Sequence, residues 1–208
     1  MRSIKRTTVV LAALGLMFSP ISANAAQDPL KTMPLTEVLN LPQAKFDTNS
    51  ADFDIFTNVF MDVWGQLPES PIQAIANGNT APTAFVPTDG AFRSLVKYLT
   101  GKTIKSEQQV ATAVMSLGAK TVEKVILYHV VVGDPILSPA ALQANGASLK
   151  SAANETVGVR VSGNTITLVD KVAKHRNPTV ILAAVDINKG NKQVAHGINQ
   201  VMLPTLGK

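Results

Sequence analysis

The first half of the chain carries apolar residues at helical spacing. Phe53, Phe56, Val59, Phe60 and Val63 recur every three or four positions, which places them on one face of a helix. Large side chains on one helix face are typical of core packing. The same periodicity, together with residues that favour helix ends, predicts further helices at 35–40, 70–78, 88–101, 106–118 and 121–128.

Alternating apolar and polar residues predominate in the second half. The runs 157–161 and 166–168 alternate in this way, and the turn residues 162–164 between them predict a β-hairpin with a three-residue loop. A short helix is expected after Ser138. Three more strands are predicted at 83–87, 180–182 and 198–203, with a polar loop at 188–193. A helical first half and a strand-rich second half predict an α+β fold.

The first 25 residues have the composition of a secretory signal peptide. Arg2, Lys5 and Arg6 precede an apolar run at 9–18, and Ala23-Asn24-Ala25 has the small-x-small pattern that signal peptidase cleaves. The alternative is a membrane anchor, which needs roughly 20 apolar residues, about twice the length of this run. The sequence therefore predicts cleavage after Ala25, a secreted or periplasmic location, and no membrane span in the mature chain.

Cleavage would change the net charge. The 208 residues include 19 Lys and Arg against 14 Asp and Glu, a formal net charge of +5. Removing residues 1–25 takes away Arg2, Lys5 and Arg6 and no acidic residue, so the mature chain is almost neutral. The basic character of the precursor therefore does not indicate nucleic-acid binding.

Residue types that carry catalysis or bind metals are sparse. The chain has no cysteine, which excludes disulfides, thiolate nucleophiles and Cys-type zinc sites. His129, His175 and His196 lack a short metal-ligand spacing, and His175 is expected to be solvated between Lys174 and Arg176. The carboxylates are scattered, although folding can bring them together. The sequence predicts no cofactor, no metal and no enzymatic activity. Export without disulfides favours a bacterial protein.

Three segments, in this order, resemble the fasciclin domain. Residues 83–92 (TAFVPTDGAF) are similar to the family's T-V-F-A-P-T-D-x-A-F box, and residues 127–131 (LYHVV) to its L-x-Y-H-V centre. Residues 196–204 (HGINQVMLP) are similar to its terminal H-V-I-D-x-V-L-x-P strand. The resemblance implies helices in the first half packed on a β-sheet wedge formed mainly by the second half. It places the domain at 51–208, after an N-terminal leader segment at 26–50.

The resemblance also implies a function. We expect a non-enzymatic exported protein that mediates cell adhesion or a cell-surface interaction with a protein or polysaccharide partner. The candidate residues, either partner contacts or structural groups, are Thr88, Asp89, Tyr128, His129 and His196. In the structural interpretation, Thr88 and Asp89 serve a helix N-terminus, and the Tyr and His side chains need hydrogen-bond partners if buried. The alternative is an envelope protein that senses or binds a small ligand in a pocket of the long helical segments at 61–82 and 100–116.

Overall fold

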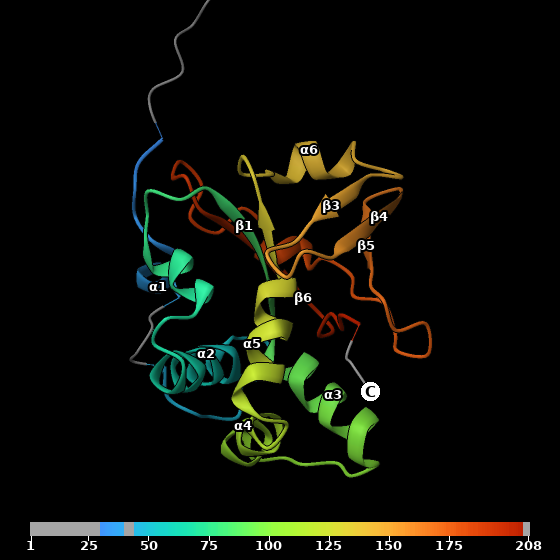
Figure 1. The fold of residues 1–208 in the computed structure, drawn as a ribbon. Coiled ribbons are helices and arrows are strands. Elements are labelled where there is room, and N and C mark those ends of the chain that lie inside the picture. Colours follow the sequence, from blue (N-terminus) through green and yellow to red (C-terminus); the bar gives the residue numbers. More distant parts are fainter. Residues whose placement is uncertain (1–29, 40–43, 206–208) are drawn as a thin grey trace, which may run out of the picture.

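The computed structural model describes residues 30–39 and 44–205 (Figure 1). The predicted signal peptide lies outside these residues. The helices are α1 (Leu35–Val38), α2 (Asp54–Gln66), α3 (Asp89–Thr100), α4 (Glu107–Met115), α5 (Ala119–Tyr128) and α6 (Ser138–Leu142), with short 3₁₀ helices η1 (Pro71–Ala76) and η2 (Leu182–Ala184). The strands are β1 (Pro82–Pro87), β2 (Val130–Val132), β3 (Ser148–Lys150), β4 (Thr156–Ser162), β5 (Thr165–Val169) and β6 (Val194–Ile198). Within the described ranges, no helix combines the length and apolarity needed to cross a membrane.

Local sequence signals account for the ends of the main helices. The Thr88 hydroxyl accepts a hydrogen bond from the backbone N–H of Ala91 at the start of α3, and Ser106 caps α4 in the same way. Gly101 ends α3 with a φ of 72°, a left-handed conformation that glycine adopts without strain. Ser70 caps η1 as predicted, but the segment forms a 3₁₀ helix instead of an α-helix.

The strands form two three-stranded sheets. The first has the order β2-β1-β6, with β1 antiparallel to β2 and parallel to β6. The second has the order β3-β4-β5 and is antiparallel throughout. In Figure 1, helices α2 to α5 gather at one end of the molecule, and the second sheet lies with α6 at the other. The architecture is α+β, as the sequence predicted.

Strand β1 separates two apolar cores. Ala84 and Val86 face the core formed with the helices, and Phe85 between them faces the core that contains β4 and β5. This division follows from the alternation of side chains along a strand. Because every residue of β1 is buried, neither face of the strand is exposed to solvent.

Three strand predictions need correction. Ser162 pairs directly with Thr165, so the hairpin loop has two residues and not three. The predicted strand at 180–182 is reduced to an isolated bridge between Val180 and Ile198, and η2 begins at Leu182.

The predicted strand at 198–203 does not form, and the strand of this region is β6, which ends at Ile198 where the predicted strand begins. Its partner β1 ends at Pro87, opposite Ile198, where the chain turns into α3. The backbone N–H groups of Met202 and Leu203 donate to side chains instead, those of His129 and Asp170. Residues 199–203 therefore have no neighbouring strand in the described part of the chain, and they follow an irregular path that side-chain hydrogen bonds hold in place.

The described part of the predicted leader packs against the domain. Leu35 is fully buried, and its backbone N–H donates to Oε1 of Gln193 at 2.8 Å. Lys31 pairs with the loop near Asn191. Gly78 lies so close to Thr32 that a Cβ atom on it would come within 1.7 Å of the Thr32 carbonyl oxygen. Residues 30–39 therefore contribute to the folded unit, and the boundary at residue 51 remains a prediction.

Candidate functional site

His129 is a buried link between α5 and the C-terminal segment. Its Nδ1 lies 2.7 Å from the Val125 carbonyl oxygen, and its Nε2 accepts a hydrogen bond from the Met202 backbone N–H at 2.8 Å. Since Nε2 accepts, the proton resides on Nδ1 and the ring is neutral. Burial lowers the pKa of His129 to about 4, which agrees with this assignment.

Tyr128 and His196 are also buried and hydrogen-bonded. The Tyr128 hydroxyl donates to the Thr156 carbonyl oxygen at 3.1 Å and joins α5 to β4, and burial raises its pKa. The His196 Nδ1 accepts from the backbone N–H of Asp186, so its Nε2–H donates to the Ile136 carbonyl oxygen at 2.7 Å. Burial lowers the pKa of His196 as well.

Thr88 and Asp89 lie where the first sheet passes into the helices. The Thr88 backbone N–H donates to the Ile198 carbonyl oxygen at 3.1 Å. The Asp89 Oδ1 accepts from the backbone N–H of Ile55 at 2.9 Å, so Asp89 also serves the first turn of α2. Burial and the nearby Asp52 carboxylate raise the pKa of Asp89 to about 8.

The five candidate residues do not form one site. All five are at most 6% exposed, and their polar groups are directed at the protein interior. Hydrogen bonds of Tyr128 and His129 connect α5 to β4 and to the C-terminal segment. His196 is hydrogen-bonded to the chain after β2, and Thr88 and Asp89 accept hydrogen bonds from the first turns of α3 and α2. In the folded protein, these side chains present very little surface to a protein partner, although the His129 ring also lines an apolar pocket.

His175 corrects a further expectation. The sequence predicts it in solvent between two basic residues, but it is only 6% exposed and its ring packs against the Tyr98 ring in a T-shaped arrangement, with a centroid distance of 4.9 Å. Its Nδ1 lies 3.7 Å from the Asp170 carboxylate. The flanking Lys174 and Arg176 side chains are exposed, so the charge of the neighbouring residues did not indicate that the His175 side chain is buried.

An apolar pocket opens between helices α2 to α5. Its volume is about 130 Å³, and Leu99 and Leu117 on its wall are more than 40% exposed. The His129 ring and Thr121 are the polar side chains of the wall. The remaining residues are Phe56, Val59, Pro87, Phe92, Leu95, Val114, Val122, Val125, Ile126, Val201 and Leu203. A space of this size suits a small apolar group and has little to bind a charged one.

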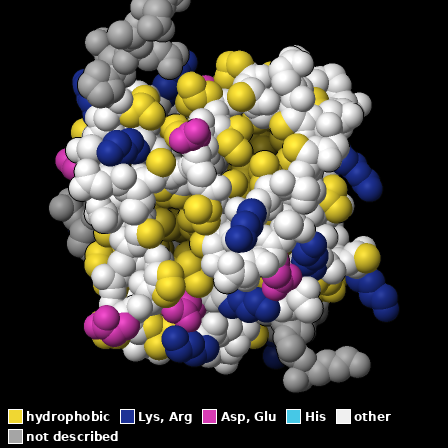
Figure 2. Space-filling view, turned by 45° about the horizontal axis from the view of Figure 1, so that its top comes forward, with side chains coloured by type: hydrophobic (Ala, Val, Ile, Leu, Met, Phe, Trp, Pro, Cys, Tyr) yellow, Lys and Arg dark blue, Asp and Glu magenta, His cyan; other side chains and the backbone are white. Residues whose placement is uncertain are grey.

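A larger apolar groove lies beside β2. It has a volume of about 390 Å³ between η1, the start of β1 and the segment from Val130 to Asp134. Val132 in this groove is 62% exposed, more than any other large apolar side chain of the described residues. Figure 2 shows a face on which apolar side chains gather in hollows, with Lys, Arg, Asp and Glu side chains scattered beside them. Exposed apolar area of this kind is typical of binding surfaces.

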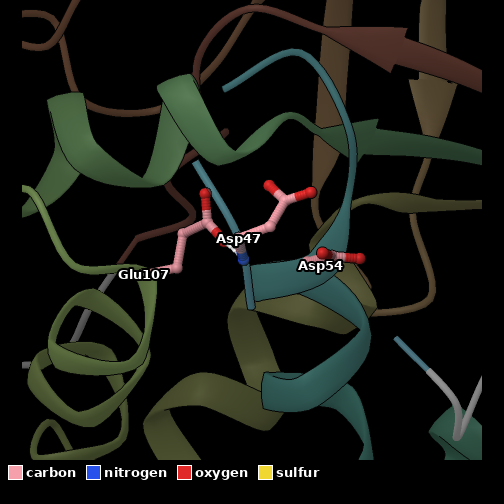
Figure 3. A group of neighbouring side chains, drawn as sticks. All are labelled: Asp47, Asp54 and Glu107. Carbon is pink, nitrogen blue, oxygen red and sulfur yellow. Dashed lines mark hydrogen bonds between the residues drawn. The ribbon is translucent and has the colours of Figure 1, made fainter. Parts of the chain in front are cut away.

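The fold also gathers carboxylates that are scattered along the sequence. Asp47, Asp54 and Glu107 come together from the loop before α2 and the first residues of α2 and α4 (Figure 3). Asp52 and Asp89 adjoin Asp54 to form a second group of three. The sequence does show an acidic residue at the first position of three successive helices, α2, α3 and α4. It does not show that these helix ends meet in the fold.

Comparison with known protein families finds a match to one of them. The family model of the Fasciclin domain matches residues 69–204, more than half of the chain. No curated protein matches the sequence. One similar solved structure is a FAS1 domain pair from the insect cell adhesion molecule fasciclin I, with 12% identity and a TM-score of 0.48. The similarity covers 74% of this chain and 49% of the insect chain, so this chain spans about half the length of the domain pair.

Proposed function

The chain belongs to the fasciclin-domain family, and we propose that it mediates cell adhesion or another extracellular surface interaction without acting as an enzyme. The match of residues 69–204 to the Fasciclin domain supports this proposal, because fasciclin domains are known in cell-adhesion proteins. The proposal includes export, with residues 1–25 acting as the signal peptide. The exported chain would be almost neutral and would therefore not rely on charge to reach its partner.

The groove beside β2 favours a protein as the partner. Ile72, Ile75, Leu127, Val130 and Val132 give it an apolar wall. A polysaccharide presents hydroxyl groups that lose hydrogen bonds to water when they are buried against such a wall. An apolar side chain of a protein partner gains free energy from the same burial. We therefore place the contact in this groove and not at the buried Tyr128-His129 pair.

Binding to intact cells and to extracted surface proteins tests the proposal. The protein is expected to bind a saturable number of sites, and Val132→Asp is expected to weaken binding about tenfold or more because a charge would be buried in the contact. Leu182→Asp is the matched control, since Leu182 is 51% exposed but does not line the groove.

Three results would count against the proposal. The adhesion function fails if the protein does not bind at high micromolar concentration. The groove assignment fails if the two variants bind equally well. Binding that only purified surface polysaccharide competes for would overturn the choice of a protein partner.

The pocket among α2 to α5 supports a second candidate function, a small-ligand-binding or sensor role in the cell envelope. Its wall includes Val114, which lies within the long segment 100–116 that suggested a pocket. Leu99 at the end of α3 and Leu117 in the turn after α4 adjoin this segment and also line the pocket. Its size fits a benzene-like ring or the end of an acyl chain.

Thermal unfolding in the presence of small aromatic and short acyl compounds tests this second function. A binder should raise the midpoint in a saturable way. Leu99→Asp should abolish the shift because it puts a charge in the pocket wall, whereas Leu182→Asp should keep it. The same flat response for all compounds would argue against a ligand pocket.

A further inference from the structure

Five acidic side chains gather where three helices begin. Asp54, Asp89 and Glu107 are the first residues of α2, α3 and α4, and Asp47 and Asp52 lie in the segment that leads into α2. One carboxylate oxygen from each of Asp52, Asp54 and Asp89 lies within 4.8 Å of the other two, and the same holds for Asp47, Asp54 and Glu107. Figure 3 shows Asp47, Asp54 and Glu107, and Asp54 also belongs to the group with Asp52 and Asp89.

The helix ends neutralise only part of this negative charge. Each helix N-terminus carries about half a positive charge. Arg93 adds one more, because its guanidinium group forms an ion pair with Glu107 at 2.8 Å. With all five carboxylates ionised, the state that a bound cation would favour, the negative charge exceeds these positive groups by about 2.5 charges. Another positive species of that size therefore fits the cluster.

Two of the converging carboxylates have buried oxygens with unfilled hydrogen-bonding capacity. Asp89 is fully buried, and while its Oδ1 accepts from the Ile55 N–H, its Oδ2 has no partner among the described residues. The same is true of Oδ1 of Asp52 within that part of the chain. Burying a carboxylate oxygen without a partner costs free energy, and a cation removes that cost.

Backbone hydrogen bonds hold these side chains in place. The Asp89 N–H donates to the Asp52 carbonyl oxygen at 3.0 Å, and the Gly90 N–H donates to that of Ser50 at 2.9 Å. These bonds fix the loop before α2 on the start of α3, which brings residues from two distant parts of the sequence together. Asp52 and Asp54 are partly exposed, so water can reach the group.

We propose that Asp52, Asp54 and Asp89 bind a calcium ion at the junction of α2 and α3. All three ligand groups are hard oxygen donors, and the group contains no histidine, which would favour a transition metal. Calcium tolerates irregular coordination and completes its shell with water, whereas magnesium requires near-ideal octahedral geometry. The bound ion would join the start of α2 to the start of α3 and neutralise the excess charge.

Calorimetry and thermal unfolding of the full chain test the site, after treatment with a chelator and at constant ionic strength. CaCl₂ alone is expected to bind with a dissociation constant of about 10⁻⁴ to 10⁻³ M, as in other extracellular modules, and to raise the unfolding midpoint. Asp54→Asn is expected to weaken this binding about tenfold or more because it removes a charged ligand. Asp62→Asn is the matched control, since Asp62 is an exposed residue of the same helix outside both groups.

The alternative is that the carboxyl groups share protons and bind no metal. A midpoint unchanged by CaCl₂, or an equal shift in the Asp54→Asn and Asp62→Asn variants, would overturn the proposal. An equal effect of MgCl₂ would overturn the choice of calcium. If Asp54→Asn does not fold, as judged by circular dichroism, Asp52→Asn replaces it with the same expected loss of binding.

Discussion

The imidazole Nε2 of His129 accepts a hydrogen bond from the backbone N–H of Met202, a residue 73 positions further along the chain. The opposite ring nitrogen donates to the Val125 carbonyl oxygen one turn earlier in α5. One neutral side chain thus connects the last helix of the helical half to the segment after β6. Both backbone groups depend on His129 for these bonds, because α5 ends at Tyr128 and no strand within residues 30–39 and 44–205 pairs with Met202.

Replacing His129 should show the value of this link. His129→Phe leaves the Met202 N–H and the Val125 carbonyl oxygen without this partner, and we expect it to lower the free energy of unfolding by about 2–4 kcal/mol. His129→Gln can donate and accept through its amide and should lose less. Urea denaturation of the two variants and the unchanged protein measures the difference. Equal losses in both variants would show that shape, and not hydrogen bonding, sets the requirement for histidine.

The pH dependence of stability should carry the signature of the same residue. The pKa of His129 falls from 6.5 to about 4 on folding. The unfolded chain therefore binds more protons between these values, and acid favours unfolding there. The contribution of His129 to the free energy of unfolding is fully present above pH 6.5. It decreases by about 1.4 kcal/mol for each pH unit below that value and is lost as the pH falls through about 4.

The difference between the unchanged protein and His129→Gln isolates this effect. Asp89 titrates in an overlapping range with the opposite sign, because its pKa is raised to about 8, but it is present in both proteins. Chemical denaturation from pH 4 to 8 should give a difference in unfolding free energy that shrinks as the pH falls. A difference independent of pH would mean that His129 is not neutral in the folded state.

Gly78 should be the least replaceable glycine of the first half. A Cβ atom there would lie 1.7 Å from the Thr32 carbonyl oxygen and 3.3 Å from the Pro34 nitrogen. Gly78→Ala is therefore expected to displace residues 30–39 and to cost about 2 kcal/mol or more. Gly65→Ala is the control, since a Cβ at this position in α2 meets no atom within 4 Å. It should stabilise the protein by about 0.5–1 kcal/mol.

Urea denaturation gives both values, and limited proteolysis reports whether the segment 30–39 has detached. A Gly78→Ala protein as stable and as protease-resistant as Gly65→Ala would contradict the close approach of these backbones.

The helices were predictable because their signals are local. The apolar spacing of α2 and the caps at Thr88 and Ser106 involve residues three or four positions apart. The strand at 198–203 was not predictable in the same way. Its apolar residues are buried, but a strand also needs a partner, and β1 ends opposite Ile198.

Buried polar residues were the other source of error. Gln193 belongs to a segment that the sequence presents as a polar loop, yet it is fully buried. Its amide binds the backbone of Leu35, Ala74 and Asn77. His175 is similarly covered, beside Tyr98 and Asp170. A polar side chain is stable inside a protein when its hydrogen bonds are replaced, and the replacing groups lie too far away in the sequence to be recognised there.

Sequence patterns alone predict the main helices, the hairpin, the α+β class and the three segments that resemble a fasciclin domain. Folding adds that residues 30–39 join the core, that Tyr128, His129 and His196 are enclosed, and that Asp52, Asp54 and Asp89 converge. The two sets of features differ in the range of the interactions that produce them. Helix periodicity and capping act within a turn of the chain, whereas burial and charge clustering depend on contacts such as that between Leu35 and Gln193, 158 positions apart.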